Sequence, residues 1–317
     1  MGGTKRPRRR HDQGYRLLFS HPEMVEDLLR HLVREPWVQR LDLGTLRRLP
    51  ATHVSEDLRS RSPDIAWRVS FADGDLPVYL VFEFQSTIDP YMAVRMEVSV
   101  GLLLQDLIRR GEGLPGGALP PVVGVLVYNG KPPWSGAREL AELVPRAPAG
   151  LDRYRPRHRY LVVDLGRIPE GRLPGAESLV GALVRLERAR SLEEVREVVG
   201  DLGRRLPASV HRELRRAFAS WLTRVLLPAR VPEAAVPELG DLQEVETMLD
   251  EIDWTREAKE RGRQEGEARV LLSQLEHKFG RVPKKVRSRV EAANADLLLQ
   301  WAPRVLSAAR LEDVFEG

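Results

Sequence analysis

Two β-favouring segments on either side of an Asp-Gly dipeptide most restrict how this chain can fold. The segments are "SPDIAWRVSF" at 62–71 and "LPVYLVFEF" at 76–84, and "ADGD" at 72–75 joins them. Asp-Gly between two such segments is a strong signal for a β-hairpin, because glycine accepts the backbone angles of a tight turn. The pattern therefore predicts two antiparallel strands, with Phe71 opposite Leu76.

The predicted register is supported by the residues that it places together. On one face it forms only apolar pairs, which are Ile65 with Phe82, Trp67 with Leu80, Val69 with Val78 and Phe71 with Leu76. A slip of one residue would turn every side chain to the other face and destroy this agreement. The alternation itself therefore favours one register over its neighbours.

The opposite face of the same hairpin carries an unusual pair of acidic residues. The register places Asp64 opposite Glu83, and Gln85 follows on that face two residues later. Opposed Cβ atoms lie about 4.5–5.5 Å apart, so two part-buried carboxylates repel unless one takes up a proton or a cation lies between them. Two carboxylates plus water are the usual ligands of Mg²⁺ in proteins. We interpret Asp64 and Glu83 as the ligands of such a metal site.

Two other interpretations of these residues stay open at this point. In one, Asp64 is an ordinary turn or strand-start residue, and Glu83 forms an ion pair with Arg68 or Arg95. In the other, the register is displaced and the two carboxylates do not meet.

The rest of the chain predicts a mixed α/β protein followed by helices. Apolar residues have helical spacing from Asp12 to Val33, with a break near His21-Pro22, and again over 91–110. Apolar runs at 122–130 and 160–165 are typical of central strands. We expect five regions in chain order: a basic flexible arm (1–10), an α/β core (11–170), a helical extension (171–226), a Pro-rich linker (227–240), and a charged helix with a small helical domain (241–317).

The composition narrows the function classes. The 317 residues include no cysteine, which excludes disulfides, thiol nucleophiles and zinc–thiolate sites and fits a cytoplasmic location. A membrane span needs a run of about 18 apolar residues, and the sequence contains none. The basic N-terminus lacks the apolar segment of a secretory signal. The chain has 44 arginines, six lysines and a net charge of +4. This balance permits a nucleic-acid partner without requiring one.

Several blocks of the sequence resemble one nuclease family. "SPD" and "EFQ", with eighteen residues between Asp64 and Glu83, resemble the PD-(D/E)XK nuclease motif, in which Pro-Asp on one strand precedes Glu-x-Lys on the next. "HDQGYRLLFSHPEMVEDLLRHLV" (11–33), "LVFEFQSTIDPYMAVRMEVSVGLLLQDLIR" (80–109) and "YLVVDL" (160–165) resemble the recombination-promoting nuclease/putative transposase family, also called YhgA-like. The likeness covers roughly residues 11–225. The segment from about residue 265 is similar to a small uncharacterised helical domain.

The resemblance implies a PD-(D/E)XK nuclease-like mixed sheet flanked by helices, and a Mg²⁺- or Mn²⁺-dependent DNA endonuclease associated with recombination. Asp64 and Glu83 match the metal-binding carboxylates of the family, and the Phe84 carbonyl would be a third ligand. Asp12 matches a family position near the site, although an aspartate there would also suit a helix N-cap.

Gln85 stands where the wider superfamily has lysine, although glutamine is usual in this branch. A neutral amide can orient the attacking water but only weakly offsets the charge on the phosphorane. Arg95 or Arg68 would then supply the missing positive charge.

Further residues are candidates for contacts to DNA. Gln105 on the helix after the hairpin would contact the phosphate backbone, and Arg95 would help to hold it. The basic residues Arg8, Arg9 and Arg10 would add affinity without reading sequence. The alternative readings are an exposed helix glutamine and a solvated basic tail.

The function therefore has two main interpretations. The first is a metal-dependent DNA endonuclease, and the second is a nucleic-acid- or partner-binding protein that kept the nuclease fold but cleaves poorly. The preference for DNA over RNA stays open. The charged helix around 242–279 predicts either association between copies of the chain or a solvated helix.

Overall fold

The computed structural model describes residues 5–50, 64–74, 76–175, 177–231 and 236–315. Within these ranges, the side chains of residues 5–10, 253–265 and 295 lie outside the description. The chain divides into two compact units, Met1–Glu246 and Thr247–Gly317. The coarse expectation of an α/β part followed by a mostly helical part is confirmed.

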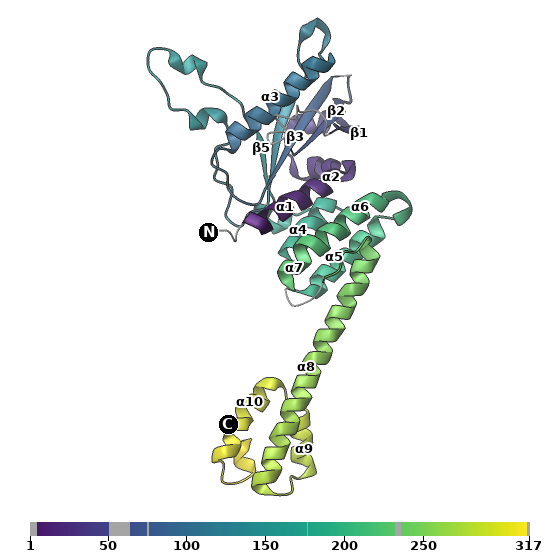
Figure 1. Ribbon diagram of the computed structural model, residues 1–317, viewed down its shortest axis with the longest axis vertical. Helices are drawn as coiled ribbons and strands as arrows, with labels where there is room; N and C mark the ends of the chain where they lie inside the picture. Colours follow the sequence, from purple (N-terminus) through teal and green to yellow (C-terminus); the bar gives the residue numbers. More distant parts are fainter. Residues whose placement is uncertain (1–4, 51–63, 75, 176, 232–235, 316–317) are drawn as a thin grey trace. The chain divides into compact units, whose positions relative to one another are not determined.

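A five-stranded mixed sheet forms the centre of the first unit (Figure 1). Its strands lie in chain order and are β1 (Leu41–Arg48), β2 (Ile65–Phe71), β3 (Pro77–Gln85), β4 (Val122–Tyr128) and β5 (Leu161–Asp164). The pairs β1–β2 and β2–β3 are antiparallel, whereas β3–β4 and β4–β5 are parallel. Helix α3 (Met92–Arg110) lies between β3 and β4 in the chain and forms the crossover that parallel strands require.

The register of the β2–β3 hairpin is the one that the alternation predicts. Ile65 pairs with Phe82, Trp67 with Leu80 and Val69 with Val78, and the Phe71 amide donates to the Leu76 carbonyl at 3.2 Å. The apolar face is buried along most of the hairpin, and only near the turn is Leu76 exposed. The prediction of this register is therefore confirmed.

Strand β1 was not expected from the sequence. Its ladder with β2 pairs Asp42 with Ser70, but further along it pairs Arg47 with Arg68, so the register shifts between these two points. Gly44 and Thr45 lie in the irregular part. This irregularity breaks the period-two pattern by which a strand is recognised in a sequence.

Two helices cover opposite faces of the sheet near the hairpin. Helix α1 (Lys5–Leu18) brings Tyr15 against Phe84, and Phe19, which follows α1, contacts both Phe82 and Phe84. Helix α3 covers the other face, where its residues join a buried cluster with Tyr79, Val81, Leu126 and Tyr128. The face of β3 that carries Glu83 is therefore the α3 face.

Helix α1 begins earlier than expected. Residues 5–10, part of the segment 1–10 that the sequence predicts as a flexible arm, lie in this helix. Pro7 is compatible with this start, because proline in the first turn of a helix sacrifices no internal hydrogen bond.

One further helix of the first unit, α2 (Pro22–Leu32), precedes the sheet in the chain. The helices that follow the sheet are α4 (Leu179–Arg188), α5 (Leu192–Arg205), α6 (Ala208–Trp221), a π-helix (Leu222–Leu226) and α7 (Leu227–Arg230). The buried Asp27 links α2 to the N-terminus of α4. Its Oδ2 accepts hydrogen bonds from the Ser178 hydroxyl at 2.5 Å and the Val180 amide at 2.8 Å. Short 3₁₀ turns occur at Pro36–Arg40, Pro115–Gly117, Leu140–Leu143, Leu151–Tyr154, Leu165–Arg167 and Glu170–Arg172.

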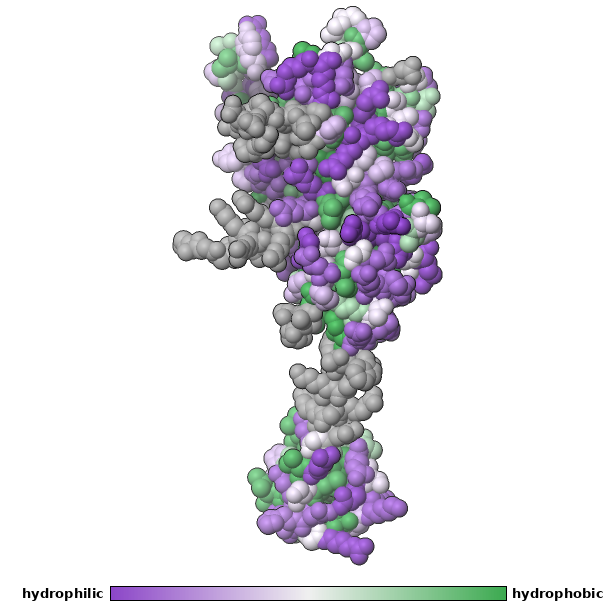
Figure 2. Space-filling model, turned by 45° about the vertical axis from the view of Figure 1, so that its right-hand side comes forward, coloured by the Kyte–Doolittle hydropathy of each residue, from purple (hydrophilic) through white to green (hydrophobic). Residues whose placement is uncertain are grey.

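The second unit is helical and has its own core. Helix α8 (Leu242–Phe279) crosses the division between the units, and α9 (Lys284–Glu291), α10 (Ala295–Ser307) and a 3₁₀ turn (Glu312–Val314) follow it. Leu275, Val290, Trp301 and Val314 belong to its buried cluster. Figure 2 shows hydrophobic patches on this unit, and Val270, Leu299 and Leu306 are exposed.

None of the described helices is both long enough and apolar enough to cross a membrane.

Candidate active site

The hairpin register brings the two predicted carboxylates together at the end of β3. Ile65 pairs with Phe82, so the preceding residue, Asp64, lies opposite Glu83. The Asp64 carboxylate is fixed there, because its Oδ2 accepts a hydrogen bond from the Phe84 amide at 3.0 Å. The first structural requirement of the metal interpretation is therefore met.

Glu83 is buried and has two partners on α3. Its side chain is only 3% exposed. Its Oε2 accepts from Arg95 Nη2 at 2.8 Å, and its Oε1 accepts from the Ser99 hydroxyl at 2.9 Å. Arg95 is thus the partner that one alternative interpretation named. Arg68 lies elsewhere, opposite Tyr79 in the ladder.

Asp12 joins the carboxylates from helix α1. Burial raises the pKa of its carboxyl group to about 6; Asp64 raises it further, whereas Ser86 and Arg95 lower it. The alternative reading as a helix N-cap is wrong, because α1 begins at Lys5 and Asp12 lies inside it. Asp64 therefore disfavours the ionised forms of both Asp12 and Glu83.

The pKa values show that the arginines do not fully balance these acids. Burial raises the pKa of Glu83 to about 7, and the charge of Asp64 adds to the effect, although Arg95, Ser99 and Arg16 act in the opposite direction. Burial also raises the pKa of Asp64. The hydrogen bond from the Phe84 amide and the charges of Arg16 and Arg95 act in the opposite direction. The charged forms of both carboxyl groups are therefore disfavoured here, chiefly because burial removes them from water.

The donor atoms at this point fit a hard divalent cation. Asp64 and Glu83 offer carboxylate oxygens, which Mg²⁺ prefers. The Phe84 amide points toward Asp64, and the carbonyl of a strand residue points to the same edge as its amide. Within the described ranges, no group of three or more His, Asp and Glu residues has the arrangement of a metal site. The protein ligands would therefore be two carboxylates and one carbonyl.

Arg95 would compete with a cation for the charge of Glu83. Both Glu83 oxygens already accept hydrogen bonds, and Arg95 also donates to Asp89 Oδ2 at 3.2 Å. The Arg95 side chain is 45% exposed, so water can solvate it after it leaves Glu83. Arg95 therefore neutralises part of the charge that a cation at Glu83 would balance.

The structure places the other predicted site residues at different distances from this cluster. Gln85 ends β3 on the same face as Glu83 and is half-buried. Gln105 is exposed on α3, ten residues after Arg95 and therefore about 15 Å further along the helix. The structure does not bring it to the carboxylates. The side chains of Arg8, Arg9 and Arg10 lie outside the described residues.

Two residues at the site were missed by sequence reasoning. Arg16 Nη1 lies 3.9 Å from Asp64 Oδ1, and Ser99 donates to Glu83. Each is four residues after a residue already singled out, Asp12 or Arg95, and so lies on the same helix face. That spacing is a signal that could have identified both.

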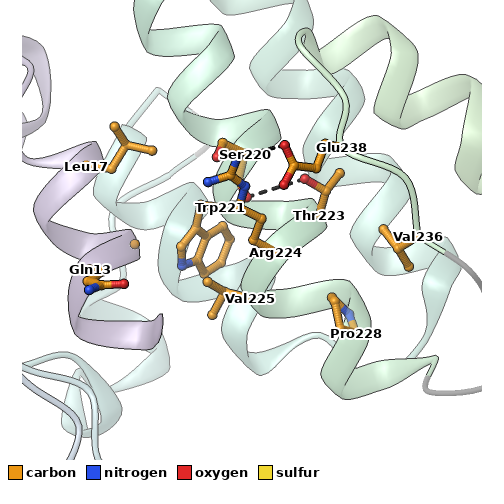
Figure 3. A pocket seen from close by; sticks show the side chains of 11 residues that line it. Gln13, Leu17, Ser220, Trp221, Thr223, Arg224, Val225, Pro228, Val236 and Glu238 are labelled. Carbon is orange, nitrogen blue, oxygen red and sulfur yellow. Dashed lines mark hydrogen bonds and ion pairs between the residues drawn. The ribbon is translucent and has the colours of Figure 1, made fainter. Parts of the chain in front are cut away.

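A separate cavity of about 470 Å³ lies between α1 and the π-helix (Figure 3). Gln13 and Leu17 line it from α1, and the Arg224–Glu238 ion pair, at 2.7 Å, crosses one side. The acidic residues Asp12, Asp64 and Glu83 are not part of its described lining. It is therefore distinct from the carboxylate site.

Comparisons with known proteins point to one family. The family model described as "Putative transposase, YhgA-like" matches residues 9–213. Similar curated proteins include the recombination-promoting nuclease RpnD of Escherichia coli, 31% identical over 128 residues, which are 39% of this chain and 48% of that protein. The recombination-promoting nuclease RpnA of Escherichia coli is 28% identical over 120 residues, 38% of this chain and 40% of that protein.

A further relative is described as inactive. This protein, the inactive recombination-promoting nuclease-like protein RpnE of Escherichia coli, is 31% identical over 121 residues, 38% of this chain and 39% of that protein. The chain thus spans less than half the length of each of these three relatives. No solved structure matches the chain.

Proposed function

The chain belongs to the YhgA-like family of putative transposases and recombination-promoting nucleases, and from this premise we propose that it is a metal-dependent nuclease that hydrolyses DNA. The observation that carries the proposal is the pair of opposed acids at the end of the hairpin. Asp64 is held beside Glu83 by the Phe84 amide, and the pKa of Glu83 is raised to about 7. Such a pair gains stability when a cation binds.

The protein groups that would hold the cation are Asp64, Glu83 and the Phe84 carbonyl. A bound Mg²⁺ or Mn²⁺ would polarise the phosphodiester and lower the pKa of a water molecule. Gln85, on the same face of β3, would orient the attacking water through its side-chain amide.

Two further groups would complete the reaction. Arg95, once released from Glu83, would offset the charge that develops on the phosphoryl oxygens, because its guanidinium stays protonated throughout. The carboxylate of Asp12, with a pKa of about 6, is mostly ionised at pH 7 and would accept the proton that the attacking water loses.

A second candidate function is a protein that binds DNA or a partner but cleaves poorly. Gln85 favours it, because a neutral amide replaces the lysine of the wider superfamily. The name of the inactive relative RpnE shows that loss of activity is described within the similar proteins. The substrate and the link to recombination are proposals, since the chain covers only part of its relatives.

A plasmid assay tests the proposal. Purified protein is mixed with supercoiled plasmid in Mg²⁺, in Mn²⁺ and in EDTA. We expect nicking with metal only, and a loss of at least about 100-fold in Asp64→Ala, since an essential metal ligand is removed. Asp73→Ala is the matched control, because Asp73 lies in the turn of the same hairpin and pairs with Arg40. Equal cleavage by Asp64→Ala and the unmutated chain would refute the assignment. Metal-independent DNA binding without cleavage would favour the second function.

A further inference from the structure

The connection between β4 and β5 forms an arm of the first unit that the candidate site does not use. Figure 1 shows this connection as a long teal loop that projects away from the sheet. We call residues 138–160 the β4–β5 arm. Between residues 144 and 160 it contains five arginines and one acidic residue, Asp152. This part of the arm is therefore strongly basic.

The two ends of the β4–β5 arm are paired with each other and attached to α3. The Leu140 amide donates to the His158 carbonyl at 3.0 Å. The Tyr160 amide donates to the Arg138 carbonyl at 3.3 Å. His158 Nδ1 also lies 2.7 Å from Glu97 Oε2 on α3. The arm thus has a fixed stem.

A tight turn reverses the chain at the tip of the arm. Ala149 and Gly150 both have a positive φ, of 57° and 78°. The Leu151 amide donates to the Pro148 carbonyl at 3.3 Å and closes the turn. The chain therefore returns toward the stem directly after the tip.

Two charged side chains brace the arm from within. Asp152 Oδ1 accepts a hydrogen bond from the Ala147 amide at 3.0 Å. Arg155 Nη2 donates to the Val144 carbonyl at 2.8 Å and also to the Ala141 carbonyl. The Arg155 side chain is only 20% exposed. One arginine and the single acid of this part of the arm therefore serve its own conformation.

The other four arginines of the same part face solvent. Within the described part of the chain they form no ion pair, and all of them are exposed: Arg146, Arg153, Arg157 and Arg159. The Arg153 guanidinium carbon lies 4.9 Å from the centre of the Tyr154 ring, and this contact restricts the arginine side chain. The arm therefore presents four positive charges that no carboxylate balances.

The arm begins beside the candidate active site. Gly136, two residues before the arm, lies so close to the loop after β3 that a Cβ atom there would be 3.2 Å from the Asp89 carbonyl oxygen. Asp89 Oδ2 accepts a hydrogen bond from Arg95, and Arg95 also donates to Glu83. A ligand that extends from the carboxylates along this side therefore meets the arm.

We propose that the β4–β5 arm binds the phosphate backbone of duplex DNA beside the cleavage site; this inference rests on the proposed nuclease function. Each exposed guanidinium can form paired hydrogen bonds with a phosphate and release the counterions condensed there. The regular phosphates of DNA supply the negative charge that the arm lacks. Because the arm is braced before DNA binds, little conformational entropy is lost on binding. Contacts to phosphates give affinity without reading the base sequence.

Arg34 and Arg212 provide a matched control for net charge. Both are exposed, and in the ranges that the structure describes neither forms an ion pair. Arg34 follows α2, which packs against β1, the strand at the opposite edge of the sheet from β5. Arg212 lies on α6. Replacing both removes two positive charges and leaves the arm unchanged.

The experiment measures DNA affinity without cleavage. Binding of a fluorescein-labelled DNA duplex to the full chain in EDTA is followed by anisotropy between about 50 and 200 mM NaCl, the range in which phosphate contacts dominate the salt dependence. The proteins are the unmutated chain, the arm variant Arg153→Gln/Arg157→Gln and the control variant Arg34→Gln/Arg212→Gln. An RNA duplex of the same sequence is titrated in parallel, and circular dichroism checks that each variant is folded.

We expect the arm variant to bind DNA about 50-fold more weakly at about 0.1 M salt, with a salt slope smaller by about 2, the contribution of two phosphate contacts. The control variant should bind within about twofold of the unmutated chain. Equal losses in the two variants would overturn the inference, because net charge would then explain the effect.

Three other results would also overturn it. Unchanged DNA binding by the arm variant would do so and leave the nuclease function standing, because the plasmid assay tests that function separately. Tighter binding to the RNA duplex, lost in the arm variant, would assign the arm to RNA instead. A lack of DNA binding by the unmutated chain would leave the arm without its ligand.

Discussion

The Asp64 carboxylate accepts a hydrogen bond from the Phe84 amide at 3.0 Å, and this bond fixes an acid that precedes β2 beside the end of β3. Phe84 follows Glu83, so the same contact sets the separation of the two carboxylates. The interaction uses only one oxygen of Asp64. The other, Oδ1, faces Arg16 at 3.9 Å and remains available to a cation.

The first prediction concerns Glu83 and pH. The pKa of Glu83 is raised from 4.5 to about 7, so the folded state binds more protons than the unfolded state between these values. The free energy of unfolding therefore falls as pH rises through this window. In EDTA, we expect Glu83→Gln to gain stability relative to the unmutated chain from pH 5 to pH 8.

Urea unfolding of the two proteins at several pH values measures this difference. The comparison is needed because Asp12 and Glu187 also have raised pKa values, of about 6 and about 7, and contribute to both proteins alike. If the stability difference does not depend on pH, the pKa of Glu83 is the same in the folded and unfolded states, which contradicts this prediction.

The second prediction concerns Arg95, which pairs with Glu83 at 2.8 Å. Replacing it by glutamine removes a positive charge that competes with the metal ion. We expect Arg95→Gln to bind Mn²⁺ about tenfold more tightly at pH 8.5, where Glu83 is ionised, a gain of ~1.4 kcal/mol. The same variant should cleave DNA more slowly, because it lacks the charge that stabilises the phosphoryl group.

Arg109→Gln is the control for this experiment, since Arg109 lies on the same helix and pairs with Asp106. Calorimetric titration with Mn²⁺ and a cleavage assay at saturating metal separate the two effects. Weaker metal binding by Arg95→Gln would contradict the idea that the arginine and the cation compete.

The third prediction concerns Gln85 at the end of β3. Lysine at this position adds a positive charge beside the scissile phosphate while keeping a hydrogen-bond donor for the water. We expect Gln85→Lys to raise the single-turnover cleavage rate by about tenfold, and Gln85→Leu, which has no donor, to lower it by about 100-fold. If cleavage by Gln85→Leu equals that of the unmutated chain, Gln85 has no part in the reaction.

The fourth prediction concerns the packing of α1, which carries Asp12. A Cβ atom at Gly14 would lie 2.6 Å from Trp221 Cδ1, so an alanine would push α1 away from α6. We expect Gly14→Ala to cost about 1–3 kcal/mol of stability and to reduce cleavage. Gly101→Ala in α3, where a Cβ meets nothing within 4 Å, should instead stabilise by up to about 1 kcal/mol. Denaturant unfolding measures the stability of both variants. Equal changes in the free energy of unfolding would show that the contact between position 14 and Trp221 is unimportant.

The hairpin and its acidic pair follow from the sequence because they depend on local alternation. Ile65 and Phe82 must be buried together, and this requirement places Asp64 opposite Glu83 whatever the rest of the chain does. Strand β1 could not be recognised in the same way, because its pairing shifts between Asp42 and Arg47. A shifted strand shows no regular period.

The partner of Glu83 shows where sequence reasoning stops. Arg68 lies on the same hairpin face as Glu83, but β2 carries it to a position opposite Tyr79. Arg95 reaches Glu83 because α3 crosses that face, and the angle of this crossing depends on tertiary packing. The same limitation applies to Gln105, whose helix leads it away from the carboxylates.

Metal binding itself tests the central claim most directly. Calorimetric titration of the unmutated chain with Mn²⁺ at pH 8 should show binding that is abolished in Asp64→Asn and in Glu83→Gln and retained in Asp73→Asn. Loss in both site variants with retention in the control is the result that an ion shared by the two carboxylates predicts. Equal Mn²⁺ binding by all four proteins, or none by the unmutated chain, would contradict it.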